Sequence, residues 1–244
     1  MLVKRTDWSD YLPPGELMSL SRSETPVRAH RFQRVAGILL ILAPVQYWIF
    51  EAISAAAWHK PPYSYTYNWV SDLGVTAARA EFEGRVVSSP LHALMNGSFT
   101  ALGLLVLIAT VLLFLSQKGL RGRAALLTFG IVFAGGSWLV AGFPENTIGA
   151  LHLTGAFGNI VGGNVFVILL GALGAVAASS RPLRLVFVGL GALGLIATVL
   201  LFALHSFYNG GTERVAAYSY MVGFAVAGIA FLANRRAAPS LRLS

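Results

Sequence analysis

The 244-residue chain contains no cysteine and few charged residues, only 11% of the total. The lack of cysteine excludes disulfide bonds, thiolate metal sites and cysteine nucleophiles, and it leaves the redox compartment open. Because 56% of the residues are hydrophobic, too little polar surface remains for a water-soluble fold of this size. The composition therefore indicates an integral membrane protein.

Six apolar stretches are long enough to cross a bilayer as helices, which takes about 20 residues each. The first stretch is too long for the apolar core of a secretory signal, so we expect an uncleaved first helix. The sequence thus predicts an all-α fold, an integral membrane bundle of six transmembrane helices. The predicted spans are residues 35–55, 91–115, 124–142, 151–177, 183–204 and 215–233.

Basic residues predict the orientation of this bundle. If the N-terminus lies inside, 14 of the 18 Lys and Arg residues fall on the inner side. Because Lys and Arg prefer the cytoplasmic side, both termini are predicted to be cytoplasmic, in the plasma membrane. The net charge of +8 is then explained by topology and not by nucleic-acid binding. The expected parts are a flexible tail (1–33), a membrane domain (34–235) with a long outer loop (56–90), and a second tail (236–244).

Polar residues gather at the predicted outer ends of the spans, where they are costly to keep in an apolar background. Glu51 lies about one turn inside the first span and needs a partner, for which Arg214 and His205 are candidates. The outer loop is rich in aromatic residues, which suit the headgroup layer. We expect part of this loop to fold back and bring Ser71 and Asp72 against the helices.

Two kinds of chemistry would use the outer cluster. In one, His92, His152 and His205 hold a zinc ion, helped by an acidic residue, and the ion activates water. In the other, a histidine acts without metal as the base for a hydroxyl such as that of Ser71 or Ser89. No HExxH or GxSxG motif is present, and each residue alone could simply cap a helix or face water.

The candidate residues fall into two groups. Those expected to carry chemistry are Ser71, Asp72, His92, Glu145, His152 and His205, with the three histidines as the candidate zinc ligands. Those expected to bind substrate are Glu51, Trp69, Asn96, Asn146, Asn159 and Arg214.

Three runs of residues carry a resemblance to a known family: NWVSDLG at 68–74, SPLHALMN at 89–96, and GFPEN at 142–146 followed by Leu151 and His152. Over about residues 33–235 the chain resembles the bacterial membrane-protein family catalogued as domain of unknown function 998. The order of the motifs is also distantly similar to the Frag1/DRAM/Sfk1 group, whose members are linked to lipid remodelling and distribution. The resemblance implies a six-helix fold with a signature outer face, and it supplies no reaction.

Three functions are compatible with these features. The first is a membrane-embedded hydrolase or acyltransferase that acts on a lipid-like substrate entering between helices. The second is a non-catalytic lipid binder or transporter, and the third is an accessory subunit of a membrane complex. Membrane lipids are the expected partners in the first two cases, and a second copy of the chain or another membrane protein is the candidate partner in the third.

Overall fold

The structure is a computed structural model of the whole chain. It describes all residues except 1–13, 78–79, 83, 177–179, 205–208 and 235–244.

Six long apolar helices dominate the described part of the chain, and each is long enough to cross a membrane. The predicted all-helical architecture of a multi-pass membrane protein is confirmed. The helices are α1 (Pro14–Ala56), α2 (His92–Ser116), α3 (Arg123–Gly142), α4 (Gly149–Ala172), α5 (Arg181–Leu204) and α6 (Asn209–Ala233).

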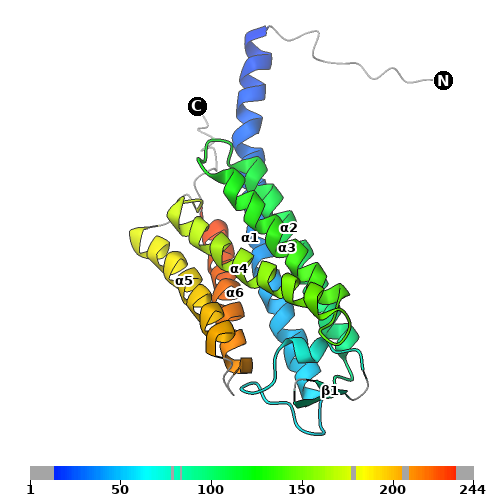
Figure 1. The fold of residues 1–244 in the computed structure, drawn as a ribbon. Helices are drawn as coiled ribbons and strands as arrows, with labels where there is room; N and C mark the ends of the chain where they lie inside the picture. Colours follow the sequence, from blue (N-terminus) through cyan, green and yellow to red (C-terminus); the bar gives the residue numbers. More distant parts are fainter. Residues whose placement is uncertain (1–13, 78–79, 83, 177–179, 205–208, 235–244) are drawn as a thin grey trace, which may run out of the picture.

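The six helices form a closed bundle in which each packs against its neighbours in the sequence and α1 packs against α6 (Figure 1). Helix α4 also contacts α6 across the bundle. The start of α1 and the end of α6 lie at one end, called here the terminal end. The connection from α1 to α2 lies at the opposite end, called here the loop end.

Two features differ from the sequence prediction. Helix α1 begins at Pro14, so residues 14–33, which were assigned to the tail, belong to the helix of the first span. The start of this helix projects beyond the bundle (Figure 1), whereas His30 already contacts the carbonyl oxygen of Asn234, just after α6. The outer connection also contains a short antiparallel hairpin of β1 (Ala80–Phe82) and β2 (Arg85–Val87). Before the hairpin, a 3-10 helix, η2 (Ser71–Gly74), is buried along its full length.

Small residues let the helices approach closely at two contacts that position the site. A Cβ atom on Gly37 of α1 would lie 2.9 Å from the carbonyl oxygen of Gly228 of α6. A Cβ atom on Gly136 of α3 would lie 2.6 Å from the carbonyl oxygen of Gly155 of α4. Neither contact leaves room for a side chain. Small residues at such contacts are the usual means by which helices pack tightly in lipid.

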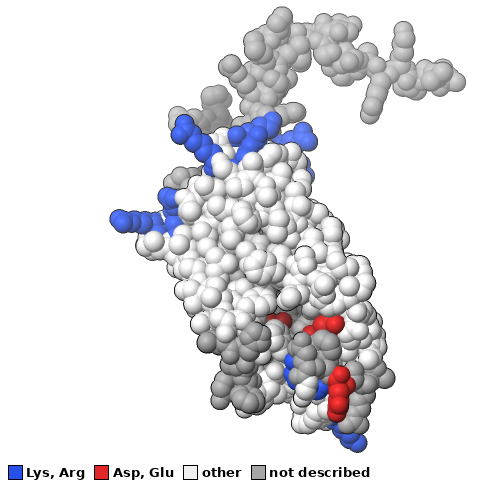
Figure 2. Space-filling view, in the orientation of Figure 1, with Lys and Arg blue, Asp and Glu red and all other residues white. Residues whose placement is uncertain are grey.

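Charge is distributed unevenly along the bundle (Figure 2). The described acidic side chains lie at the loop end, whereas most described basic side chains lie at the terminal end. This asymmetry fits the predicted orientation with the loop end outside the cell, which stays a prediction. The acidic residues are Glu51, Asp72, Glu81, Glu145 and Glu213, and the basic residues of the terminal end are Arg28, Arg31, Arg34, Lys118, Arg121, Arg123, Arg181 and Arg184.

Candidate functional site

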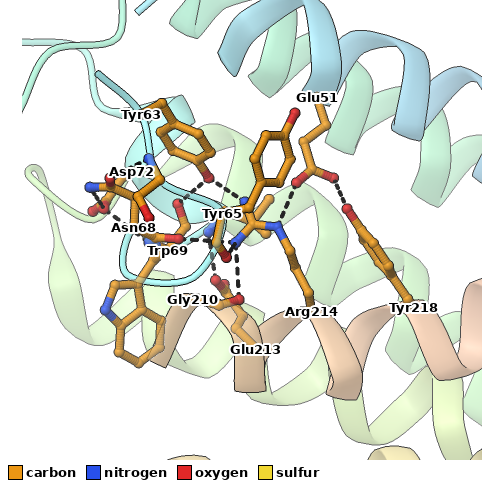
Figure 3. A network of polar contacts seen from close by, with 12 residues as sticks. Glu51, Tyr63, Tyr65, Asn68, Trp69, Asp72, Gly210, Glu213, Arg214 and Tyr218 are labelled. Atoms are coloured by element: carbon orange, nitrogen blue, oxygen red, sulfur yellow. Dashed lines mark hydrogen bonds and ion pairs between the residues drawn. The ribbon is translucent and has the colours of Figure 1, made fainter. Parts of the chain in front are cut away.

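A buried ion pair joins the ends of α1 and α6 at the loop end (Figure 3). Arg214 Nε donates to Glu51 Oε1 over 2.9 Å, and the hydroxyl of Tyr218 donates to Glu51 Oε2 over 2.6 Å. Glu51 is 1% exposed and Arg214 is 6% exposed. Each charge is therefore compensated by the other and not by water. The prediction that Glu51 has a partner, with Arg214 as one candidate, is confirmed.

Arg214 also holds the first part of the outer connection. Its Nη1 donates to the backbone carbonyl oxygens of Tyr65, Asn68 and Gly210 over 2.8–3.0 Å. Its Nη2 donates to the hydroxyl of Tyr63, and its guanidinium lies 4.8 Å from the ring centre of Tyr65. The guanidinium therefore supplies hydrogen bonds to backbone carbonyl oxygens that have no partner in a helix or sheet, because this segment has no regular structure.

Asp72 of η2 forms the second charged centre. Its Oδ2 accepts hydrogen bonds from the side-chain amide of Asn68 and the backbone N–H of Trp69, at 3.1 and 3.0 Å. Its Oδ1 pairs with Arg85 of β2 at 3.0 Å, and Arg85 lies over the Trp69 ring. Asp72 is fully buried, so the expected folding of η2 against the helices is confirmed. Its hydrogen-bond partners are loop residues, and no described histidine is among them.

The start of α2 holds η2 from the other side. The Ser89 hydroxyl donates to the carbonyl oxygen of Leu73, and the Asn96 side-chain amide donates to that of Gly74 over 2.9 Å. His92 Nδ1 donates to the Ser89 carbonyl oxygen over 3.0 Å, since a carbonyl can only accept. Asn96 and His92, expected to bind substrate and to carry chemistry respectively, thus also have structural contacts in the loop.

Glu145, in the connection from α3 to α4, lies beside Asp72. Its Oε2 accepts a hydrogen bond from the Ser71 hydroxyl over 3.0 Å. Its Oε1 lies 3.8 Å from Arg85 Nη2 and has no hydrogen-bond partner among the described residues. Burial and the neighbouring Asp72 carboxylate raise the pKa of Glu145 to about 9. At neutral pH this carboxyl group therefore keeps its proton.

A cavity of about 300 Å³ lies next to Glu145, between α4, α5 and α6. One wall is polar and comes mainly from the outer connection and the helix ends, with Trp69, Ser71, Glu145, His152 and Glu213. The other wall is apolar and includes Leu153, Ala156, Ile160, Leu201 and Phe202 of α4 and α5. Leu153 is 53% exposed and Phe202 is 37% exposed on the outside of the bundle. The cavity therefore borders the surface that faces lipid.

A second, smaller cavity of about 30 Å³ continues toward the bundle interior and shares Ser71, His152 and Glu213 with the first. It reaches Asn159, whose amide donates to the Ser137 hydroxyl over 2.6 Å and whose carbonyl accepts from Tyr220 over 2.7 Å. Asn159, expected to bind substrate, therefore has its amide paired within the helices.

His152, on the first turn of α4, lines both cavities. Its Nδ1 donates to the carbonyl oxygen of Phe143 at the end of α3, over 3.0 Å. In the neutral ring Nε2 is then the acceptor nitrogen. Asn146, also expected to bind substrate, instead pairs with the backbone and hydroxyl of Thr76 at 3.2 Å.

The zinc hypothesis is not supported by the described part of the site. His92 and His152 contact the carbonyl oxygens of Ser89 and Phe143, and His205 lies outside the described residues. Among the residues that the structure describes, no group of three or more His, Asp or Glu is placed to hold a metal ion. Zinc binding therefore stays a prediction that depends on His205.

Three residues of the site were not singled out from the sequence. Arg85 and Tyr63 belong to an outer connection without a regular pattern, so nothing indicated their contacts. Glu213 accepts a hydrogen bond from the Val70 backbone N–H over 2.5 Å and lines both cavities. Its signal in the sequence was its position beside Arg214 at the outer end of a span, where a carboxylate is costly.

Comparison with known proteins gives one finding. A family model described as "Protein of unknown function (DUF998)" matches residues 41–235, which is more than half of the chain. No curated protein matches the chain, and no solved structure matches it. The matched range spans the six transmembrane helices apart from the start of α1, together with the outer connection.

Proposed function

The chain belongs to the DUF998 family of proteins of unknown function, and we propose that it binds a membrane lipid or lipid-like amphiphile in the cavity between α4, α5 and α6. The observation that carries this proposal is the two-sided character of the cavity. One wall is polar and buried at the loop end, and the other is apolar and borders the lipid-facing surface. An amphiphile has the same division between a polar head and an apolar chain.

The size of the cavity agrees with a head group and not with a whole lipid. Small-molecule sites begin at about 300 Å³, which matches this cavity, whereas a full acyl chain needs more room. The polar head would contact Ser71, Glu145 and Glu213, and the chain would leave past Leu153 and Phe202 into the bilayer. Entry is then sideways from the membrane, without passage through water.

A second candidate function is that of a hydrolase or acyltransferase acting on a lipid-like substrate. It is favoured by one observation, that Ser71, Glu145 and His152 line the same cavity. The Ser71 hydroxyl donates to Glu145, but a carboxyl with a pKa of about 9 keeps its proton at neutral pH. Glu145 would then serve as a general acid and not as the base for Ser71. Binding without chemistry is therefore the better-supported function.

Native mass spectrometry tests the binding proposal. Ala156 lies in the cavity wall, so Ala156→Phe should fill the cavity and remove most of the amphiphile that co-purifies with the protein. The matched control is Ala52→Phe, because Ala52 is exposed on α1. The control should keep the wild-type amount of bound amphiphile. Equal amounts in the two variants would mean that the bound molecules lie elsewhere.

The enzymatic candidate has a separate test. Purified protein is incubated with fluorogenic lipid esters, and Glu145→Gln is compared with the wild type. A hydrolase that uses Glu145 as its acid should lose about 100-fold or more of its rate. Binding of the ester without release of product by the wild type would exclude the hydrolase and leave the binding proposal intact.

A further inference from the structure

Among the described residues, the polar wall of the cavity contains two carboxyl groups and no Lys or Arg side chain. Among the described residues that line it, the polar ones are Trp69, Ser71, Glu145, His152 and Glu213, and none is Lys or Arg. A wall of this kind differs from a phosphate site, in which Arg, Lys or several backbone N–H groups meet the anion.

Two basic residues close to this wall, Arg214 and Arg85, are already paired. Arg214 donates to Glu51 and to three backbone carbonyl oxygens, and it is buried. Arg85 pairs with Asp72 over 3.0 Å. An anionic head group would have to break one of these pairs and leave a buried carboxylate without its partner, which is costly.

One buried carboxyl oxygen on this wall lacks a partner in the described part of the chain. Glu145 Oε1 has no hydrogen-bond partner among the described residues, and the Glu145 side chain is only 9% exposed. Glu213, also in this wall, uses one oxygen to accept from the Val70 backbone N–H. A buried polar atom without a partner costs about 1–3 kcal/mol, so a hydrogen-bonding group brought by a ligand would stabilise the site.

We propose that the head group bound in this cavity donates hydrogen bonds and carries no negative charge, as a hydroxyl-bearing or amine-bearing amphiphile does. This inference rests on the proposed function. The head group would form hydrogen bonds with the carboxyl groups of Glu145 and Glu213 and would donate to Nε2 of His152. Anionic phospholipid head groups are disfavoured, because they would place a phosphate against these carboxyl groups in a region of low dielectric constant.

The test uses three amphiphiles with the same dodecyl chain, so that only the head group differs. They are dodecyl glucoside, dodecylamine and dodecyl phosphate, each added to the full chain in nanodiscs of phosphatidylcholine. The measured quantity is the Tm of the wild type minus that of Ala156→Phe under the same conditions, which removes general effects on the bilayer. The glucoside and the amine should raise this difference by about 2–4 °C near saturation, and the phosphate should not.

A second variant tests the role of Glu145 directly. Glu145→Gln keeps an acceptor oxygen and removes the ionisable group, so the response to dodecylamine should fall more than the response to dodecyl glucoside. Dodecyl phosphate binding as well as the other two would overturn the head-group inference and leave the proposed function standing. If none of the three amphiphiles changed the difference in Tm, both the inference and the proposed function would fail.

Discussion

Two buried carboxylates at the loop end, Glu51 and Asp72, are each paired with an arginine. Glu51 and Arg214 lie on different helices, α1 and α6, and both are buried. Asp72 and Arg85 repeat the arrangement within the outer connection. In both cases the loss of the arginine would leave a carboxylate in a region that water cannot reach, so the stability of the loop end depends on the pairs and not on single residues.

The first prediction concerns the pair between α1 and α6. Glu51→Leu and Arg214→Met should each lower the free energy of unfolding by about 3–5 kcal/mol, because the remaining charge stays buried. The double variant should lose less than the sum of the two, since it leaves no unpaired charge. Unfolding in mixed micelles measures these values. Arg121→Met, at an exposed site of the terminal end, is the control, with a change within about 0.5 kcal/mol. Additive losses would contradict the pairing.

The second prediction concerns the proton on Glu145. The pKa of this carboxyl is about 9 in the folded protein, against about 4.3 for an unperturbed Glu in an unfolded chain. Between these values the folded state holds a proton that the unfolded state has lost. The contribution of Glu145 to the free energy of unfolding therefore falls as pH rises from about 4 to 9.

Glu145→Gln removes this titration. Unfolding measured from pH 5 to 9 should show the variant gaining stability relative to the wild type as pH rises. If the free energies of unfolding of the two proteins changed in parallel with pH across this range, Glu145 would be ionised in the folded state and its pKa would not be raised.

At the scale of single elements, the start of α6 is fitted closely to the outer connection. A Cβ atom on Gly210 would lie 2.1 Å from the carbonyl oxygen of Asn68, whereas a Cβ atom on the adjacent Gly211 would have only Thr66 O nearby, at 3.9 Å. Gly210→Ala should therefore lower the free energy of unfolding by about 1–3 kcal/mol through overpacking. Gly211→Ala should be neutral or stabilising by up to about 1 kcal/mol, because Ala favours helix. Equal effects would contradict this fit.

The helices could be predicted from the sequence far better than the outer connection. A span must satisfy its backbone internally and present apolar residues to lipid, so length and composition alone identify it. The partner of Glu51 followed from the same cost, because a carboxylate inside a span needs a cation nearby. The partner of Asp72 could not be predicted in this way, since Arg85 lies in a loop whose residues have no periodicity. The carbonyl partners of His92 and His152 could not be predicted either, because a position near the surface does not reveal a backbone partner.

At the scale of the whole molecule, the orientation in the membrane is a prediction from charge. The chain has no native cysteine, so single cysteines can be introduced without background. Thr76→Cys at the loop end should react with an impermeant thiol reagent in intact cells, because its site is exposed and predicted to lie outside. Lys118→Cys at the terminal end should react only after the membrane is opened. Reversed labelling would place the cavity on the cytoplasmic side.

The proposed lipid site places a head group at the loop end and a chain along α4 and α5. The bound molecule therefore lies within one bilayer leaflet. The cavity lies at the loop end, and its lining includes both apolar residues and carboxyl groups. If the loop end faces outward, the bound molecule is an amphiphile of the outer leaflet.

A crystal structure grown from a lipid mesophase would show directly whether an amphiphile occupies the cavity. We expect electron density for an amphiphile with its head beside Ser71, Glu145 and Glu213 and its chain leaving past Leu153 and Phe202. A cavity closed by its own side chains would rule out the lipid site, as would lipids ordered around the bundle with none entering between α4 and α5.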